Sequence, residues 1–251
     1  EFRRVLFRSL TRRAEELGFD LVFGLAQWAS KGGYGGTTKY RETSLDSFIA
    51  TAALAGATER ILLISTLHIL YGPWHPVHLA KFGATLDHIA RGRWGINMVT
   101  GYAAREPAMF GMTKVEHDLR YEMAEVFASR LAQLWSSNEN LTVDGPYWSM
   151  EDAFVTPKPR FGRPIMVNAS GSAAGIRYGV RHSDIMFITS PAGNQLEDAV
   201  VSVPGHVAAI RTAAAAEGRQ VRTIINPMIL CRDTEREAIA FTVVGPEAPL
   251  A

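Results

Sequence analysis

The sequence predicts an α/β fold, a (β/α)8 barrel that is incomplete at both ends. Short apolar segments of strand length alternate with longer helical segments, and each crossover is long enough to join parallel strands. Polar residues recur where successive predicted strands end: Gln27, Thr66, Asn97, Asn168 and Thr189. Because barrels of this kind carry their sites at the carboxyl ends of the strands, this recurrence favours a barrel over a doubly wound open sheet.

The composition is that of a globular protein with one sizeable core. The chain has 251 residues, of which 47% are hydrophobic and 20% charged. The formal net charge of +1 gives no electrostatic reason to expect a nucleic acid or an anionic membrane as partner. The single cysteine, Cys231, excludes an internal disulfide and fits a reducing, cytoplasmic compartment. No continuous apolar run reaches the roughly 18 residues of a membrane span, so we expect no membrane segment.

Residues 1–9 differ in character from the rest of the chain. They match neither a signal peptide nor a first strand, and they look like a translated sequencing adapter joined to the reading frame. We therefore expect a non-native leader over 1–9, and one domain over 10–251 that is a fragment of a longer barrel. The first and last barrel strands are expected to be missing from this fragment.

Apolar runs and helical periodicity place the individual elements. After residue 9 the chain opens with the end of an amphipathic helix, in which Leu10, Ala14 and Leu17 recur at helical spacing before the stop signal Gly18. The elements predicted next are a strand over 19–25, a helix capped by Thr43 or Ser44 with Leu45, Phe48, Ile49, Ala52 and Ala53 on its inward face, a strand over 60–67 and a helix over 76–91. Those that follow are a strand over 94–99, a helix over 117–135, a turn-rich excursion outside the main sheet over 140–154, a strand over 164–167, a helix ending near 182, a strand over 184–189, a helix over 195–218 and a strand over 222–231.

The predicted strand over 94–99 carries the most informative polar side chain. Asn97 interrupts a segment that otherwise reads as the near-continuous apolar run of a buried parallel strand. A buried amide is costly unless something bonds to it. Asn97 therefore either satisfies neighbouring backbone groups or meets a ligand near the end of the strand.

Two further positions are candidates for binding an anion. The turn that contains Ser172 lies between a strand and a helix, where backbone N–H groups and a hydroxyl can bind phosphate; ordinary helix capping is the alternative. Arg120 and Tyr121 lie at the start of the long helix, where a guanidinium and a phenol could clamp phosphate or a sugar. The alternative for this pair is a solvated helix start.

The histidines do not form a recognisable metal motif. His68, His75 and His78 have no acidic or cysteine ligand nearby in the sequence, so we expect no metal site. His75 is expected at the start of a helix, and His68 follows Thr66 closely enough to face a pocket. The sequence also lacks a nucleophile motif and paired carboxylates, so the chemistry is expected to belong to a bound cofactor.

Several short motifs occur in a fixed order along the chain. They are Leu17-Gly18-Phe19-Asp20, Thr58-Glu59-Arg60-Ile61, Leu86-Asp87-His88-Ile89 with Arg91-Gly92-Arg93, Gly95 to Gly101, His117 to Tyr121, Pro157-Lys158-Pro159 and Cys231 to Thr234. As a set, from residue 10 to about 238, they resemble the bacterial luciferase-like flavin monooxygenases, in the branch of dimethylsulfone monooxygenases and pyrimidine oxygenases. The loop over 27–36 and Gly72-Pro73-Trp74 are nearer to the sulfone enzymes.

The resemblance implies a TIM barrel of the luciferase-like type that binds reduced FMN. By this resemblance the cofactor contacts are Ala26, Gln27, Thr66, Asn97, Glu106, Arg120, Tyr121 and Ser172. Thr66 and Asn97 are also the expected catalytic residues, which hold O2 toward the flavin. Trp28 and His68 are the expected substrate contacts, and no metal is expected.

The activity implied is that of a two-component monooxygenase. A separate NAD(P)H flavin reductase supplies reduced FMN, and this chain uses it with O2 to oxygenate a small substrate such as a sulfone, a sulfonate or a pyrimidine-like amide. The full-length protein is expected to be a homo-oligomer. Two alternatives stay open: a deazaflavin-dependent hydride-transfer oxidoreductase on the same fold, and a flavin-binding fragment without catalysis.

Overall fold

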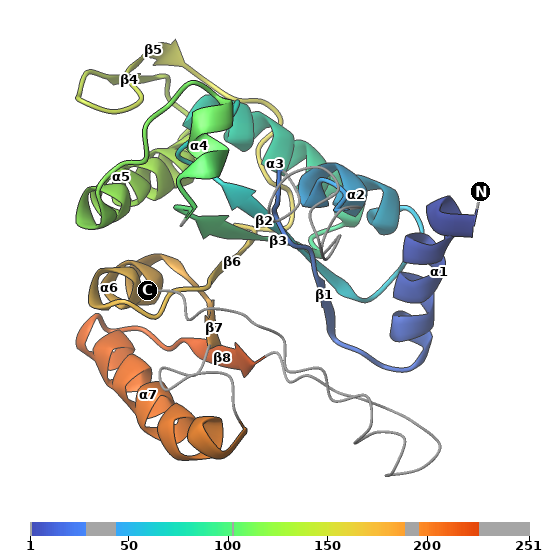
Figure 1. The fold of residues 1–251 in the computed structure, drawn as a ribbon. Helices are drawn as coiled ribbons and strands as arrows, with labels where there is room; N and C mark the ends of the chain where they lie inside the picture. Colours follow the sequence, from blue (N-terminus) through green and yellow to red (C-terminus); the bar gives the residue numbers. More distant parts are fainter. Residues whose placement is uncertain (1, 29–43, 102, 189–195, 226–251) are drawn as a thin grey trace, which may run out of the picture. The chain divides into compact units, whose positions relative to one another are not determined.

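The computed structural model describes residues 2–28, 44–101, 103–188 and 196–225 (Figure 1). The chain divides into two compact units, residues 1–168 and residues 169–251, and each is described by itself. Several sequence predictions fall outside the described residues: the cap at Thr43, the strand end at Thr189, and everything beyond residue 225, including Cys231.

A parallel sheet forms the centre of the first unit. Its strands are β1 (Leu21–Phe23), β2 (Leu62–His68), β3 (Trp94–Val99) and β6 (Ile165–Asn168), hydrogen-bonded in that order. The helices of this unit are α1 (Phe2–Glu16), α2 (Ser47–Ala55), α3 (Pro76–Ala90), α4 (Arg105–Met109) and α5 (His117–Ser136). The predicted alternation of parallel strands with helices is therefore confirmed, whereas closure of a complete barrel is not shown.

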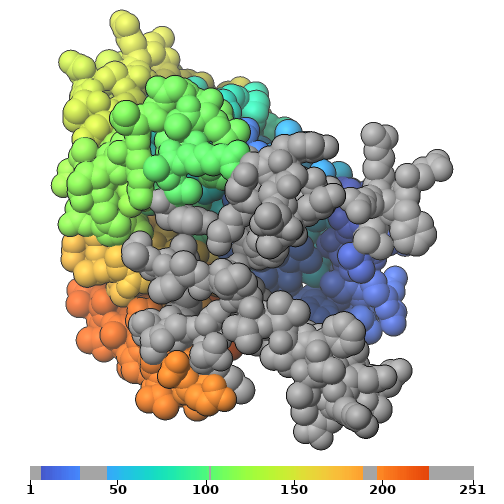
Figure 2. All heavy atoms as spheres, in the orientation of Figure 1, coloured from blue at the N-terminus to red at the C-terminus, as the bar shows by residue number. Residues whose placement is uncertain are grey.

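The predicted excursion outside the main sheet is confirmed as a hairpin. Strands β4 (Leu141–Val143) and β5 (Met150–Ala153) pair antiparallel in a sheet of their own. The hairpin packs on α5 through an edge-to-face contact of Trp148 with Phe127, whose ring centroids lie 5.0 Å apart. In the space-filling view, α4, α5 and this hairpin share one face of the first unit (Figure 2).

The two faces of the central sheet have different roles. The register pairs Ser65 with Ile96 and Thr66 with Asn97, and paired residues of parallel strands project to the same side. On the face of Ser65, the Trp94 ring makes edge-to-face contacts with Phe48 of α2 and Trp135 of α5. The helices therefore cover this face, and Thr66 and Asn97 project from the opposite one.

The structure corrects the predicted inward face of α2. The helix is capped by Asp46, whose carboxylate accepts the Ile49 N–H at 2.8 Å, and not by Ser44. Leu45 and Ile49 are 58% and 73% exposed, and the buried residues are Ser47, Phe48, Thr51, Leu54 and Ala55. A tertiary contact explains this difference. The Ser47 hydroxyl accepts the Thr66 N–H and donates to the Thr66 carbonyl, so Ser47 faces the sheet.

Helix α1 differs from its prediction in extent and in orientation. It runs from Phe2 to Glu16, so the predicted boundary between a leader and a domain lies inside one continuous helix, and that division stays a prediction. Leu10 and Leu17 are both more than half exposed, and Thr11 is the buried residue among the helix side chains that the structure describes, from Phe7 onward. The end of the helix is anchored by the Glu15 carboxylate, which accepts backbone N–H groups of residues 59–61.

The second unit is a β/α arrangement with its own core. It contains α6 (Ala173–His182), β7 (Ile185–Ile188), α7 (Leu196–Ala216) and β8 (Arg222–Ile225), and β7 pairs parallel with β8. Its core consists of Val180, Met186, Ile188, Ile210, Ala214 and Val221. The helix and strand predictions for this part of the chain are confirmed up to residue 225.

Helix α7 has the length of a membrane span. Among the described residues, its segment Glu197–Ala216 is the one helix that is long and apolar enough to cross a membrane, with a mean hydropathy of 1.3. Its first turn carries Glu197 and Asp198, and Ile210 and Ala214 are buried in the core of the second unit. The core helix of a soluble protein can have the same length and apolar composition, so one such helix is weak evidence for a membrane segment.

Candidate functional site

Thr66 and Asn97 form a hydrogen-bonded pair across two neighbouring strands. They are in register on β2 and β3, and Asn97 Nδ2 donates to Thr66 Oγ1 at 3.1 Å. Both are buried, with exposures of 7% and 2%. Ser47 of α2 fixes the strand beside them through its hydrogen bonds of 3.0 Å and 2.8 Å with the Thr66 backbone. The predicted convergence of these two polar residues is confirmed.

The pair leaves hydrogen-bonding capacity for a ligand. Because Thr66 Oγ1 accepts from Asn97, its own hydroxyl proton remains for a further acceptor. Asn97 Oδ1 is buried and has no hydrogen-bond partner among the described residues. Leaving a buried acceptor unpaired costs about 1–3 kcal/mol, so such a group calls for a ligand or a water. The arrangement does not fit the alternative in which Asn97 only satisfies neighbouring backbone groups.

A second polar cluster lies at the ends of β1 and β2 and is centred on Glu106 of α4. Its carboxylate accepts the Trp28 backbone N–H at 3.2 Å and the Tyr71 hydroxyl at 2.6 Å. His68 Nδ1 lies 3.6 Å from Glu106 Oε2, beyond hydrogen-bond distance, and the His68 ring stacks on the Tyr71 ring at 4.9 Å. Burial lowers the pKa of His68 below its ordinary value, and the negative charge of Glu106 offsets part of that shift.

Aromatic side chains border this cluster. Trp28 contacts Phe110 edge-to-face at 4.8 Å, and Tyr71 lies 6.0 Å from the same ring. Gly72 has φ +83°, a conformation that favours glycine. A Cβ at this position would lie 3.3 Å from the Trp28 ring, so the absence of a side chain allows Trp28 to pack close to the backbone here. Tyr71 and Phe110 were not predicted as site residues, because neither belongs to a motif and only the folded chain brings them to Trp28.

Arg120 is buried and not solvated. It lies in the first turn of α5, is 7% exposed, and its Nε has no hydrogen-bond partner among the described residues. It lines a cavity of about 10 Å³ together with Tyr71, Thr100, Gly101 and Lys114. The alternative of a solvated helix start is therefore wrong for Arg120. A cavity of this size holds no more than one water, so its contact with a phosphate stays a prediction.

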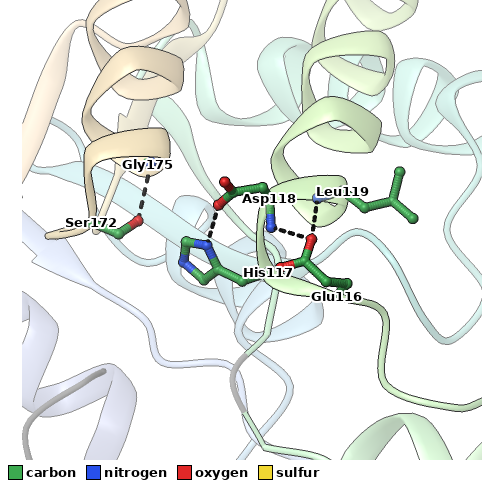
Figure 3. Close-up of polar contacts among 6 residues, drawn as sticks. All are labelled: Glu116, His117, Asp118, Leu119, Ser172 and Gly175. Carbon is green, nitrogen blue, oxygen red and sulfur yellow. Dashed lines mark hydrogen bonds and ion pairs between the residues drawn. The ribbon is translucent and has the colours of Figure 1, made fainter.

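The start of α5 is capped by the chain itself. The Glu116 carboxylate accepts the backbone N–H groups of Asp118 at 2.8 Å and Leu119 at 3.0 Å (Figure 3). His117 pairs with the Asp118 carboxylate at 2.6 Å and contacts the Tyr121 ring edge-to-face. Tyr121 is half-buried, and its role as a cofactor contact stays a prediction.

Ser172 lies in the second unit, where it caps α6. Its Oγ accepts the Gly175 N–H at 3.2 Å (Figure 3). Ordinary capping, the alternative for this residue, is therefore confirmed. A capping hydroxyl keeps its proton for a second acceptor, so the predicted phosphate contact stays open.

The remaining predicted positions have simple structural surroundings. Ala26 and Gln27 lie three and four residues after the end of β1 and are half-buried next to Trp28 in the sequence. Asn168 ends β6, where its Nδ2 donates to the Met98 carbonyl at 3.2 Å and its Oδ1 is unpaired among the described residues. His75 caps α3 by accepting the Val77 N–H, as its predicted place at a helix start required. In the described part of the chain, no group of three His, Cys, Asp or Glu side chains could hold a metal ion.

Comparison with known proteins shows which family this chain resembles. Residues 6–242 match the family described as luciferase-like monooxygenase. The chain is 31% identical over 237 residues to the pyrimidine monooxygenase RutA of Pantoea ananatis, covering 94% of this chain and 62% of that protein. It is 34% identical over 233 residues to the FMNH2-dependent dimethylsulfone monooxygenase of Pseudomonas fluorescens, covering 93% and 59%. The chain thus spans about 60% of the length of these curated relatives.

Solved structures agree on the fold. The crystal structure of riboflavin lyase (RcaE) with modified FMN and riboflavin superposes with a TM-score of 0.76 at 27% identity, covering 93% of this chain and 57% of that one. The EDTA monooxygenase EmoA from Chelativorans sp. BNC1 gives a TM-score of 0.77 at 24% identity, with coverages of 93% and 57%. An F420-dependent secondary alcohol dehydrogenase gives 0.67 at 19% identity, covering 87% and 62%, and shows the fold alone.

Proposed function

The chain belongs to the luciferase-like monooxygenase family, and from this premise we propose that it is a flavin-dependent monooxygenase that uses reduced FMN and O2 to oxygenate a small organic substrate. The observation that carries the proposal is the Thr66–Asn97 pair, which presents a hydroxyl proton and an unpaired amide oxygen from one face of the sheet. Such a pair is costly to bury without a ligand.

The polar groups present suit a flavin. A reduced isoalloxazine ring carries both N–H donors and carbonyl acceptors, and Asn97 Oδ1 and the Thr66 hydroxyl offer the complementary acceptor and donor. Ala26, Gln27 and Glu106 are the further residues proposed to contact the ring, and Arg120, Tyr121 and Ser172 those proposed to contact the ribityl phosphate. Glu106 already accepts two hydrogen bonds, so it would meet the cofactor through its remaining lone pairs.

Bound reduced FMN supplies the electrons for the reduction of O2. Thr66 and Asn97 are proposed to orient O2 beside the ring: the Thr66 hydroxyl can turn from the ring to donate to the oxygen, and the Asn97 amide holds that hydroxyl in place through its own hydrogen bond. An amide has no useful pKa, so Asn97 acts by position and not as a general base. Trp28 and Phe110, which contact each other edge-to-face, are proposed to border the substrate as an aromatic wall. His68, on the same face as Thr66, is proposed to face the substrate together with Trp28.

The substrate class and the partners follow from the relatives. We propose a small organosulfur compound, such as a sulfone or a sulfonate, or a pyrimidine-like amide, because the two relatives are named for dimethylsulfone and for pyrimidine. A separate NAD(P)H flavin reductase would supply the reduced FMN. A homo-oligomeric, cytoplasmic full-length protein belongs to the same proposal.

An anaerobic titration with reduced FMN, followed by oxygen and a panel of sulfones, sulfonates and pyrimidines, tests this function. We expect saturable binding of reduced FMN and an oxygenated product from one member of the panel. Reduced deazaflavin oxidised by substrate without oxygen uptake would instead support hydride transfer. Stabilisation by FMN without product would support a binding protein without catalysis.

Matched variants at Thr66 link the activity to the pair. Thr66→Val keeps the shape of the side chain and removes the hydroxyl, whereas Thr66→Ser keeps the hydroxyl. We expect the valine variant to lose oxygen-dependent turnover and the serine variant to retain most of it. Equal activity of the two variants would contradict a role for the hydroxyl.

A further inference from the structure

We propose that His68 is the acid–base residue of this site and that Glu106 is the residue that positions it. The acid–base role rests on the proposed monooxygenase function. The positioning by Glu106 stands on the geometry of the protein alone.

His68 lies beside the Thr66–Asn97 pair. It is the last residue of β2 and follows Thr66 by two positions, so both side chains project from the same face of the sheet. Two residues of a parallel strand span about 7 Å, so Thr66 and His68 are neighbours on this face of β2. The side chain is 6% exposed, so its protonation is controlled by the protein around it.

Glu106 is held in a fixed orientation by donors from two other segments. Tyr71, from the segment after β2, donates its hydroxyl to Oε2 at 2.6 Å, and Trp28, from the segment after β1, donates its backbone N–H to Oε1 at 3.2 Å. Hydrogen bonds to an ionised acceptor are the stronger kind, so they restrain the carboxylate well. Its Oε2 is the atom that faces His68.

A small shift of the His68 ring would form a hydrogen bond between His68 Nδ1 and Glu106 Oε2. His68 Nδ1 is buried, has no hydrogen-bond partner among the described residues, and lies 3.6 Å from Glu106 Oε2. Closing this gap by roughly 0.5 Å gives ordinary N–H···O geometry. With its proton on Nδ1 and shared with Glu106, the neutral ring keeps a lone pair on Nε2, as in other carboxylate–histidine pairs.

The electrostatics of the cluster keep this ring neutral near neutral pH. Burial lowers the pKa of His68, and Glu106 raises it only in part. Among the described residues, the Glu106 carboxylate from α4 and the Tyr71 phenol stacked on its ring are the titratable groups with a contact to the imidazole. A neutral imidazole with one free lone pair is a general base.

The proposed step balances without a further reactant. Reduced FMN (as FMNH2), O2 and substrate give FMN, oxygenated substrate and water, so two protons move to the oxygen atom that leaves as water. His68 Nε2 takes up one of these protons and returns it to that oxygen atom. The imidazole ends the turnover in the protonation state in which it began.

The test combines a titration of His68 with the pH profile of turnover. The imidazole 15N signals of the cofactor-free protein are followed with pH, and His68→Asn identifies the signal of His68. Glu106→Gln removes the negative charge, so the pKa of His68 is expected to fall further. Tyr71→Phe keeps the ring and frees Oε2 for His68, so the pKa is expected to rise. Glu16→Gln, an exposed carboxylate of α1, is the control and should change nothing.

Turnover separates an acid–base role from a structural one. The acidic limb of the kcat/KM profile should move to lower pH in Glu106→Gln and to higher pH in Tyr71→Phe. His68→Asn should lower turnover by about 10²–10⁴-fold with an unchanged melting temperature.

Each contrary result has a definite meaning. An unchanged titration of His68 in Glu106→Gln overturns the positioning role. A shifted titration with an unmoved pH profile overturns the acid–base role. A wild type with the expected titrations but no oxygen-dependent turnover overturns the proposed function and the acid–base role with it, while the positioning of His68 by Glu106 stands.

Discussion

Asn97 Nδ2 donates a hydrogen bond of 3.1 Å to Thr66 Oγ1, across strands that are adjacent in the sheet. The two residues lie 31 positions apart in the sequence and are both buried. This bond orients the Asn97 amide so that its oxygen, which has no partner among the described residues, is presented to whatever occupies this face of the sheet. The arrangement predicts which variants should separate function from stability.

Replacing Asn97 with alanine should slow the oxygen step and keep the fold. The variant loses the amide that orients the Thr66 hydroxyl. Loss of one preorganised donor at a developing negative charge costs roughly 2.7–4 kcal/mol, which is a hundredfold or more in rate. Stopped-flow oxidation of the bound reduced flavin measures the rate, and a melting curve of the same variant measures stability. A destabilised variant with wild-type oxygen kinetics would remove Asn97 from the mechanism.

Ser65 provides the control for this experiment, because it neighbours Thr66 but projects from the helix-covered face. Its hydroxyl donates to Thr51 Oγ1 at 2.9 Å and accepts from Trp94 Nε1 at 3.2 Å. Ser65→Ala leaves the buried Trp94 Nε1–H without its acceptor, whereas Thr51 Oγ1 still donates to the Ser47 carbonyl, and the change should cost about 1–3 kcal/mol of stability. Its oxygen kinetics per folded molecule should match the wild type.

Replacing Ser172 with alanine should weaken FMN binding by about 1 kcal/mol, rising to about 3 kcal/mol if the hydroxyl meets a charged phosphate. The same change removes the cap of α6, which by itself costs about 0.5–2 kcal/mol of stability. The two effects separate when riboflavin and FMN are compared, because only FMN carries the phosphate. Wild-type protein that binds riboflavin and FMN equally well would show that the phosphate site is not at Ser172, because no phosphate contact would then contribute to binding.

Deleting residues 1–9 should leave FMN affinity unchanged. The deletion shortens α1 and removes the Phe7 carbonyl that accepts the Thr11 hydroxyl, but it leaves the Glu15 anchor in place. Isothermal titration with FMN of both chains checks this expectation. A loss of affinity in the shorter chain would contradict the prediction that these residues are a non-native leader.

Glu15 should make the stability of the first unit depend on pH in the acid range. Burial raises the pKa of its carboxyl, but hydrogen bonds from the N–H groups of Ile61, Arg60 and Glu59 lower it by more, and the net shift is below the ordinary value of 4.5. An acid with a lowered folded pKa contributes stability that is complete above its unfolded pKa and is lost as the pH falls through the folded value. Stability should therefore fall below about pH 4.5.

Chemical unfolding between pH 6 and pH 3 tests this dependence. Glu15→Gln should show a shallower loss of stability than the wild type, because the glutamine does not titrate. Glu16→Gln, the neighbouring exposed carboxylate that pairs with Arg13, should follow the wild-type curve. Identical curves for the two variants would show that the anchor does not depend on the charge of Glu15.

The sequence by itself determined the elements whose signals are local. The strand Trp94–Val99 was predicted with its exact apolar run, and α3 and α5 were predicted within a residue or two at both ends. A strand buried on both faces reads as a near-continuous apolar run, and a helix is indicated by its period and its first-turn residue, so a few consecutive residues carry the signal. Thr66 and Asn97 were found in the same way, as polar side chains at the ends of apolar strands.

Only the tertiary structure decided which of these groups meet and which face each helix buries. The predicted inward face of α2 was right for Phe48 and wrong for Leu45 and Ile49, because the contact of Ser47 with the Thr66 backbone outweighs the apolar character of those two residues. The bond from Tyr71 to Glu106 joins residues 35 positions apart, and that from the Trp28 N–H to Glu106 spans 78 positions. No local pattern encodes such contacts, because they arise when adjacent strands bring their loops to one edge of the sheet.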